Sequence, residues 1–219
     1  MAALLLVVAA GSGSRLGRPE PKALVPLGGR PLLSWTLDAF APVAFARTVV
    51  TAPPDRLGDF ERLVGGRGRV VAGGVTRSAS VRRGFGALAP ADGDIVAVHD
   101  AARPFVSADE IRAVLRAAEE TGAAIAATPV VDTIKRVAGG RIVQTVERAG
   151  LFGAATPQAF RFEVLREALA SGGEATDEAA LCERMGLPVA VVPVSRSSFK
   201  ITTPEDLELA EAILASRRR

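Results

Sequence analysis

The first residues that could carry out chemistry lie in a glycine- and serine-rich segment near the N-terminus. Segment 11–17, with the sequence GSGSRLG, follows an apolar run at 4–10, and Lys22 comes soon after it. Glycine has no Cβ, so backbone N–H groups there can approach an anion closely, and Arg15 and Lys22 add positive charge. An apolar run that stops abruptly in a loop is typical of a buried parallel strand, and ligands bind at the carboxyl ends of such strands. The segment therefore predicts phosphate binding.

The segment does not match two better-known phosphate-binding motifs. The dinucleotide fingerprint G-x-G-x-x-G needs its third glycine one place before Gly17, and the P-loop motif G-x-x-x-x-G-K-[ST] needs a glycine where Leu16 stands. The mismatch argues against a P-loop protein and against a nucleotide-binding dehydrogenase, an alternative that titration with NAD would test. A tight connection after a strand, without any ligand, is the structural alternative.

A second group of chemically capable residues lies at 99–103, with the sequence HDAAR, after an apolar run. Asp100 would come just past a buried strand, where a carboxylate can hold Mg²⁺ against substrate phosphates, and Arg103 could bind a phosphate through two N–H groups. The structural alternative is that Asp100 caps the next turn and pairs with Arg103. His99 is the only histidine. We interpret it as a packed, hydrogen-bonded residue, because no nucleophile motif accompanies it for Ser-His-Asp hydrolysis.

Composition and charge argue against several classes of protein. The 219 residues are 48% hydrophobic, carry a net charge of +3, and include 5% aromatic residues and no tyrosine. Arginines are dispersed apart from a solvated tail at 217–219, so nucleic acid is not an expected partner. The apolar start is too short to span a membrane, and no basic residue precedes it as in a secretory signal. A single cysteine, Cys182, excludes an intrachain disulfide and agrees with a cytoplasmic protein.

Strand-like and helix-like segments alternate along most of the chain. This alternation predicts an α/β fold with a Rossmann-like, mostly parallel sheet and helices on both faces. We expect a single domain over residues 1–219, because no linker or internal repeat interrupts the pattern. The expected strands are the N-terminal apolar run, 47–51, 69–72, 95–98, 123–128 and 189–194, and the expected helices are 31–40, 55–64, 76–88, 107–122, 160–170, 177–185 and 204–215.

The alternation breaks at 130–153. Segments 132–137 and 141–146 predict two strands joined by a turn at Gly139-Gly140, with no helix between them. A two-stranded hairpin is marginally stable alone and must pack on something. We favour an inserted arm that packs on a second copy of the chain, and the alternative is an arm folded onto its own domain.

Several short segments resemble, in order and over nearly the whole chain, the motifs of the 2-C-methyl-D-erythritol 4-phosphate cytidylyltransferase family. The segment HDAAR at 99–103 is the most specific, whereas a glycine loop with an arginine and a later lysine occurs across many sugar nucleotidyltransferases. The matching segments are 9–15 with Pro21-Lys22, Gly73-Gly74 with Arg77 and Ser80-Val81, 99–103, 132–135, 156–158 and 200–206.

The resemblance implies an enzyme that transfers CMP from CTP to methylerythritol phosphate and releases pyrophosphate, with Mg²⁺, in the non-mevalonate pathway to isoprenoid precursors. In the family pattern Arg15 and Lys22 are catalytic, because they contact the triphosphate and stabilise charge that develops during attack on the α-phosphorus. Phosphoryl-type transfer depends mainly on positioning and electrostatics, which agrees with this assignment. The residues implied in nucleotide binding are Ala9, Ala10, Gly11, Gly13, Gly74 and Ser80.

The resemblance also implies a homodimer with shared active sites. Asp100 would lie beside the metal and the substrate. Methylerythritol phosphate would contact Arg103, Thr133 and Lys200 from one subunit, with Arg148 and Thr156 reaching in from the arm of the other subunit.

The chain departs from the family pattern at two places. Val75-Thr76 stands where acidic residues are common, and 195–198 lacks an acidic residue, so base selection could be looser. Segment 176–178, with the sequence TDE, is explained by a helix N-cap with first-turn acids. Two alternatives stay open: a cytidylyltransferase for another polyol phosphate, such as ribitol 5-phosphate, and a noncatalytic nucleotide sensor that binds CTP without releasing pyrophosphate.

Overall fold

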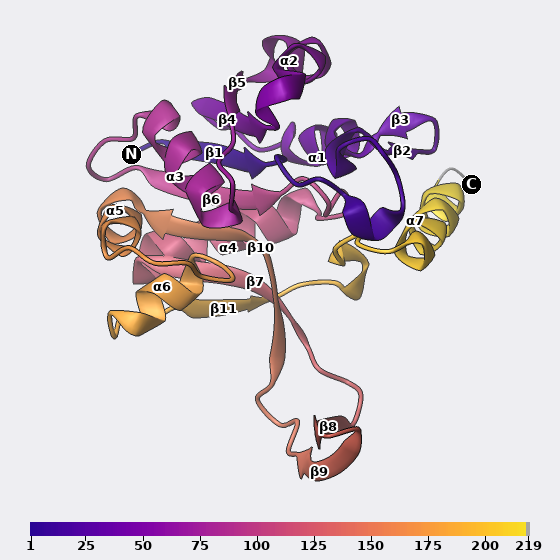
Figure 1. The fold of residues 1–219 in the computed structure, drawn as a ribbon. Coiled ribbons are helices and arrows are strands. Elements are labelled where there is room, and N and C mark those ends of the chain that lie inside the picture. The colour runs from indigo at the N-terminus through magenta and orange to yellow at the C-terminus, as the bar shows by residue number, and fades with distance from the viewer. Residues whose placement is uncertain (218–219) are drawn as a thin grey trace.

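The computed structural model describes residues 1–217, so Arg218 and Arg219 of the expected tail lie outside the described residues. Its main feature is a seven-stranded sheet in the order β11-β7-β10-β6-β1-β4-β5 (Figure 1). Neighbouring strands are parallel except at β10, which runs antiparallel to β6 and β7. The predicted mostly parallel α/β sheet is confirmed. Its strands are β1 (Ala3–Val8), β4 (Arg47–Ala52), β5 (Arg69–Ala72), β6 (Ile95–Asp100), β7 (Ala123–Pro129), β10 (Phe152–Arg161) and β11 (Ala190–Pro193).

Helices cover both faces of the sheet. Successive residues of a strand point to opposite sides, so a strand that is apolar throughout needs a hydrophobic core on each face. In β1, Leu5 and Val7 join one core, and Leu4 and Leu6 join the other. The first core is covered by α1 (Leu32–Phe40), α2 (Leu57–Val64) and α4 (Ala108–Thr121), and the second by α3 (Arg77–Leu88), α5 (Phe162–Ala170) and α6 (Ala179–Arg184). The last helix, α7 (Pro204–Arg217), packs beside the short hairpin of β2 (Pro26–Leu27) and β3 (Arg30–Pro31).

Local sequence signals explain the boundaries of α4. Glu110 N donates to Ser107 Oγ over 3.2 Å, and Ser107 N donates to the Glu110 carboxylate over 2.8 Å, so the predicted capping box is confirmed. Gly122 ends the helix in the left-handed conformation. Glu110 also accepts from Ser195 N over 2.5 Å, which ties the start of this helix to the segment before Lys200.

Strand β10 occupies residues that the sequence pattern assigns partly to the arm and partly to a helix from 160. The helix assignment is wrong at 160–161, because the strand runs to Arg161 and α5 begins only at Phe162. The segment has small residues, a glycine and a proline in place of alternating β-branched residues. Pro157 has no N–H to donate to the ladder of hydrogen bonds. It is tolerated because it lies where the register with β7 shifts and the regular ladder is interrupted. Pairing with distant strands has overridden local propensity.

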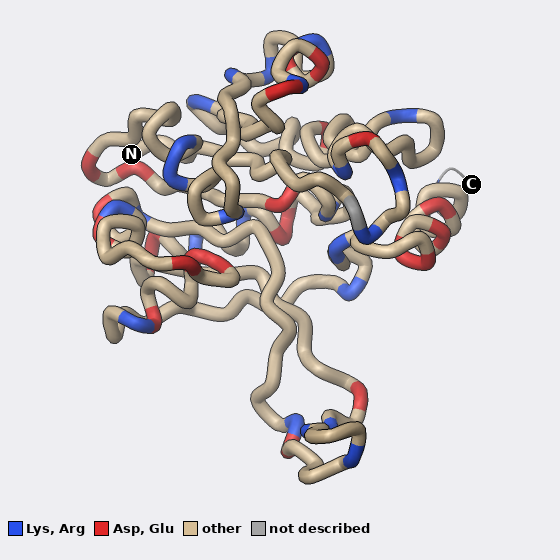
Figure 2. Tube along the Cα trace, in the orientation of Figure 1, with Lys and Arg blue, Asp and Glu red and all other residues tan. Residues whose placement is uncertain are grey.

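The predicted hairpin is confirmed and stands away from the sheet as an arm (Figure 1). It consists of β8 (Ile134–Ala138) and β9 (Arg141–Val146), which pair antiparallel in a small sheet of their own. The alternative in which the arm folds onto its own domain is therefore wrong for this structure. The arm carries exposed apolar residues, and basic and acidic residues occur on both the arm and the body (Figure 2). Among the described residues, no helix is long and apolar enough to cross a bilayer.

Candidate active site

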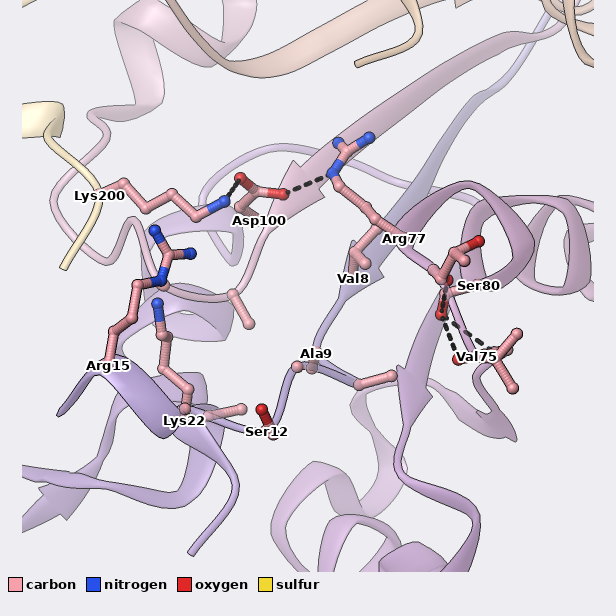
Figure 3. A pocket seen from close by; sticks show the side chains of 18 residues that line it. Val8, Ala9, Ser12, Arg15, Lys22, Val75, Arg77, Ser80, Asp100 and Lys200 are labelled. Carbon is pink, nitrogen blue, oxygen red and sulfur yellow. Dashed lines mark hydrogen bonds and ion pairs between the residues drawn. The ribbon is translucent and has the colours of Figure 1, made fainter. Parts of the chain in front are cut away.

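The carboxyl ends of β1 and β6 lie side by side, beneath a cavity of about 490 Å³. The two strands pair in parallel with Val8 opposite Asp100, so the loop after β1 faces the segment after β6. Every residue expected to bind the nucleotide lines this cavity, together with Arg15, Lys22, Asp100 and Lys200 (Figure 3). The sheet thus gathers distant residues at the edge where α/β folds bind ligands.

The loop after β1 folds back on itself, which brings its two cations to one side of the cavity. Lys22 N donates to the carbonyl oxygen of Gly11 over 3.3 Å and closes the loop. Gly13 has a φ of +74°, and a Cβ there would lie 2.9 Å from Lys22 N. A residue with a side chain is strained in that conformation, so glycine is required. Arg15 and Lys22 therefore extend next to each other (Figure 3).

We expect Gly13→Ala and Gly11→Ala to have different effects. Gly13→Ala should lower the free energy of unfolding by about 1 kcal/mol or more, because the new Cβ meets backbone at a left-handed φ. Gly11→Ala should leave stability unchanged, since no atom lies within 4 Å of its Cβ position, and should weaken binding of CTP, the nucleotide that the family resemblance implies, by filling cavity space. Thermal denaturation and calorimetric titration with CTP measure the two effects. Equal destabilisation by both substitutions would contradict this account of the loop.

The environment of Lys22 lowers the pKa of its amine, and a bound anion would raise it again. Burial and the neighbouring positive charges of Lys200 and Arg15 together lower its pKa to about 8, and the negative charges of Asp100 and Asp206 offset only part of this shift. A group of negatively charged phosphates would stabilise the protonated amine and raise this pKa again. The site therefore favours an anion at this position.

Catalytic efficiency toward CTP should fall as pH rises through the Lys22 pKa of about 8. A lysine loses its charge above its pKa, so kcat/KM, which reports the free enzyme, should drop about tenfold for each further pH unit. The fall in kcat should come at higher pH, because bound triphosphate keeps Lys22 charged. Profiles of kcat/KM for the wild type and for Lys22→Arg check this. The arginine stays protonated, so an identical alkaline fall in both proteins would show that another group titrates.

Asp100 connects cations from two sides of the cavity. Its Oδ2 accepts a 2.7 Å bond from Lys200 Nζ, and its Oδ1 accepts a 3.3 Å bond from Arg77 Nε (Figure 3). Burial alone would raise the pKa of Asp100, but Lys200 and Arg77 hold it well below its usual range, so the carboxyl group is ionised. A side-chain pair with Arg103 was the structural alternative, and it is wrong. The Arg103 N–H closes a turn on the Asp100 carbonyl, whereas its guanidinium donates to two other backbone carbonyls.

His99 and Thr156 form a buried network beneath Asp100. His99 Nε2 lies 3.1 Å from the carbonyl oxygen of Arg103, and its Nδ1 lies 3.1 Å from Thr156 Oγ1. A carbonyl only accepts, so Nε2 carries the hydrogen and Nδ1 accepts the hydroxyl hydrogen of Thr156. Thr156 Oγ1 in turn accepts from Asp100 N over 3.0 Å. Burial lowers the pKa of His99 to about 4, so the ring is neutral, and its interpretation as a packed, hydrogen-bonded residue is confirmed.

The structure corrects the implied division of acceptor contacts between subunits. Thr156 lies buried in β10, within the body of its own chain, because the arm ends before that strand begins. Thr133 is exposed and lies on the arm, just before β8, away from the group of Arg103 and Lys200 in which it was placed. The expectation that the arm carries Thr156 is therefore wrong. The expectation that Thr133 lies with Arg103 and Lys200 in the body of one chain is wrong as well. Arg148 follows β9 and belongs to the arm, as expected.

The loop before α3 forms the opposite wall of the first cavity. Ser80 Oγ accepts from Gly74 N over 3.0 Å and donates to the Thr76 carbonyl over 2.9 Å, so this hydroxyl fixes the loop that carries Gly74. Val75 is fully exposed and lines the cavity. Arg77, the first residue of α3, is a site residue to which the motif comparison gave no role. Its signal in the sequence was its place in the matching segment that begins with Gly73-Gly74, three residues before it.

A second cavity, of about 670 Å³, shares Lys200 with the first. Arg103 and Arg196 also line it, and α7 contributes apolar surface through Leu209 and Ile213. Within the described part of the chain, Arg103 Nε is buried without a hydrogen-bond partner. The buried N–H donor and the further positive charge favour an anionic group in this cavity. The apolar surface favours an attached carbon chain.

The two cavities define a class of protein. A glycine loop and cations at the end of a parallel strand can hold a nucleotide, and the second cationic cavity can hold an anionic acceptor next to it, as a nucleotidyltransferase requires.

Comparison with known proteins narrows this class. The family model described as 2-C-methyl-D-erythritol 4-phosphate cytidylyltransferase matches residues 3–216. The protein of that name from Prochlorococcus marinus is 47% identical, over 97% of this chain and 98% of its own. The crystal structure of the protein of that name from Thermus thermophilus is 39% identical, with a TM-score of 0.82 and coverage of 98% and 100%. The structure of a 4-diphosphocytidyl-2C-methyl-D-erythritol synthase from Anaerococcus prevotii is 30% identical, with a TM-score of 0.85 and coverage of 98% and 96%. The chain belongs to the 2-C-methyl-D-erythritol 4-phosphate cytidylyltransferase family.

Proposed function

We propose that this chain transfers CMP from CTP to 2-C-methyl-D-erythritol 4-phosphate, as its family name describes, and so serves the synthesis of isoprenoid precursors. A phosphate oxygen of the acceptor forms a bond to the α-phosphorus of CTP. The bond from that phosphorus to the oxygen bridging to the β-phosphate breaks, and pyrophosphate leaves. The observation that carries this proposal is the pair of cavities that share Lys200, because it lets nucleotide and acceptor meet at one cation.

Arg15 and Lys22 act on the triphosphate. Both line the first cavity beside the glycine loop, and neither belongs to an ion pair among the described residues. Their positive charge can therefore strengthen its contact with phosphate oxygens as negative charge develops on the leaving pyrophosphate. Ala9, Ala10, Gly11 and Gly13 supply the backbone around the phosphates, and the loop that Ser80 fixes at Gly74 lies toward the base.

Asp100 would hold a Mg²⁺ ion together with the substrate phosphates. Among the described residues there is no cluster of three or more His, Cys, Asp or Glu side chains that could hold a metal alone. Mg²⁺ needs no such cluster, since one or two carboxylates, phosphates and waters usually complete its shell. The Asp100 carboxylate lines the cavity and has lone pairs beyond those that Lys200 and Arg77 use. The ion would neutralise charge on the phosphates.

The acceptor occupies the second cavity. Arg103 and Lys200 offer cations to its phosphate, and the apolar surface from α7 suits the carbon chain of a small polyol. Thr156 acts from beneath this region, because its hydroxyl holds Asp100 N and His99 in place. It is a positioning residue in this proposal.

Two copies of the chain complete each site. The arm projects from the body, and it exposes Val137, Ile142 and Val143, which a partner subunit would cover. Arg148 donates a hydrogen bond to the Val131 carbonyl, so it lies near the strand entry that carries Thr133. The arm therefore offers an arginine and a threonine hydroxyl together, and we assign both to the acceptor phosphate of the partner's site.

We place the enzyme in the cytoplasm. Its single cysteine, Cys182, is a free and buried thiol, and burial raises its pKa to about 11, so it is inert and compatible with a reducing compartment.

Pyrophosphate release tests the substrate assignment. With CTP and Mg²⁺, methylerythritol phosphate should support turnover, and ribitol 5-phosphate should support it at least about tenfold less well, since its additional hydroxyl group needs a partner in a partly apolar cavity. A higher rate with ribitol 5-phosphate would contradict the acceptor. CTP binding without release of pyrophosphate from CTP in the presence of any acceptor would favour a nucleotide sensor. Removal of the metal with a chelator should abolish release, and undiminished activity would contradict the Mg²⁺ requirement.

A further inference from the structure

Segment 176–178 does more than cap a helix. Asp177 does cap, since its Oδ1 accepts from Ala180 N over 3.0 Å. Glu178, however, is only 2% exposed, and its two carboxylate oxygens accept from Arg77 Nη1 over 2.7 Å and Nη2 over 3.0 Å. A solvated first-turn acid would have no such partner. The expectation that a helix cap explains this segment is therefore wrong for Glu178.

The pair is built into the fold from two elements distant in sequence. Thr76 Oγ1 bonds to Glu174 Oε1 over 2.9 Å, and Ala175 N donates to Ser78 Oγ over 3.3 Å. These contacts hold the segment before α6 against the first turn of α3, which carries Arg77. Glu178 thus meets Arg77 from a fixed position.

The geometry of the guanidinium group limits how Arg77 can bind Asp100. Glu178 occupies the edge formed by Nη1 and Nη2, so Arg77 offers only Nε to Asp100 Oδ1. Asp100 Oδ2 consequently stays with Lys200. A guanidinium freed from Glu178 could turn and bind both oxygens of Asp100, because arginine and carboxylate groups prefer paired bonds. That movement would displace Lys200 from the point where the two cavities meet.

We propose that Glu178 is a positioning residue for this reaction: it holds the Nη edge of Arg77, so that Asp100 is shared with Lys200 between the nucleotide and acceptor cavities. The inference rests on the proposed function, because it concerns the same site. It adds a buried residue that acts on the reaction through another side chain.

Glu178→Gln tests the proposal with a nearly isosteric change. The glutamine amide would place N–H donors against an arginine donor, so the paired bond is lost. We expect turnover to fall about tenfold or more, on the scale of one lost charge-assisted hydrogen bond, with CTP affinity changed less than about twofold. Glu183→Gln is the matched control, since Glu183 is exposed and lies on α6, the helix that begins directly after Glu178. General structural damage would instead weaken CTP binding and lower the melting temperature together.

A double-mutant cycle with Arg77→Met makes the test specific. If Glu178 acts through Arg77, adding Glu178→Gln to Arg77→Met should cause no further loss of turnover. Multiplying losses in the double variant, or a folded Glu178→Gln with wild-type turnover, would overturn the proposal. If Glu178→Gln does not fold, Arg77→Met with Glu178→Met removes both buried charges and leaves Asp100 to Lys200, so turnover well below that of Arg77→Met alone would overturn the proposal. The wild type in the same assay separates the two claims, because its failure to release pyrophosphate would refute the proposed function instead.

Discussion

Lys22→Ala and Arg15→Ala should each lower turnover about 10²–10³-fold, the range found when one oriented donor to a developing charge is removed. Both side chains line the cavity next to the glycine loop, and they extend side by side. Loss of a contact that is stronger in the transition state than in the ground state lowers kcat. Loss of a contact that is equally strong in both states changes mainly substrate binding. We therefore expect the dissociation constant of CTP to change much less than kcat.

Single-turnover kinetics and calorimetric titration with CTP measure these two quantities separately. Arg18→Ala is the matched control, because Arg18 is exposed in the same part of the chain and does not line the first cavity. Near-normal turnover in Lys22→Ala or Arg15→Ala would show that the residue has no catalytic role. Weakened CTP affinity with near-normal turnover would reduce that role to ground-state binding.

The second large effect should come from the arm. If Arg148 serves the acceptor phosphate of a partner subunit, Arg148→Ala should raise the KM for methylerythritol phosphate and slow turnover, by about tenfold or more for a lost charge-assisted contact. CTP affinity should stay close to normal, because the glycine loop lies on the body of the chain. Arg141→Ala, at the opposite end of β9 on the same arm, is the control.

Mixing two inactive variants tests whether the site is shared. A heterodimer of an Arg148→Ala chain and a Lys22→Ala chain contains one site that draws an intact Lys22 from one chain and an intact Arg148 from the other. Activity should recover in verified heterodimers to about half that of the wild type, since one of the two sites is restored. Heterodimers no more active than the parent variants would mean that each arm serves its own subunit, even if the enzyme is a dimer.

Elements with strong local signals could be predicted from the sequence. The capping box at Ser107 and Glu110, the glycine that ends α4 and the Gly-Gly turn of the arm all act over a few residues, and each lies where the pattern placed it. Strand β10 could not be predicted in this way. Its place depends on pairing with β6 and β7 at opposite edges, which no local pattern of small residues and a proline can reveal.

The same distinction explains the outcome for the site. The glycine loop follows β1 directly, and Asp100 is the last residue of β6 rather than lying just past it as expected, so the meeting of both segments in one cavity was still predictable from the α/β pattern. The contact between Arg77 and Glu178 joins residues 101 positions apart, and segment 176–178 also has an adequate local explanation as a helix cap. The error at Thr156 follows directly from the missed strand, because the strand determines which residues the arm can carry.

The account depends most on the claim that a phosphate oxygen of the acceptor attacks the α-phosphorus of CTP at the junction of the two cavities. Methylerythritol phosphate with isotopically labelled oxygen in its phosphate group, supplied with unlabelled CTP and Mg²⁺, tests this claim by mass spectrometry of the products. The account predicts one CDP-alcohol for each pyrophosphate, with all of the label in the CDP-alcohol and none in the pyrophosphate. Label in the released pyrophosphate, or pyrophosphate released without a CDP-alcohol, would contradict it.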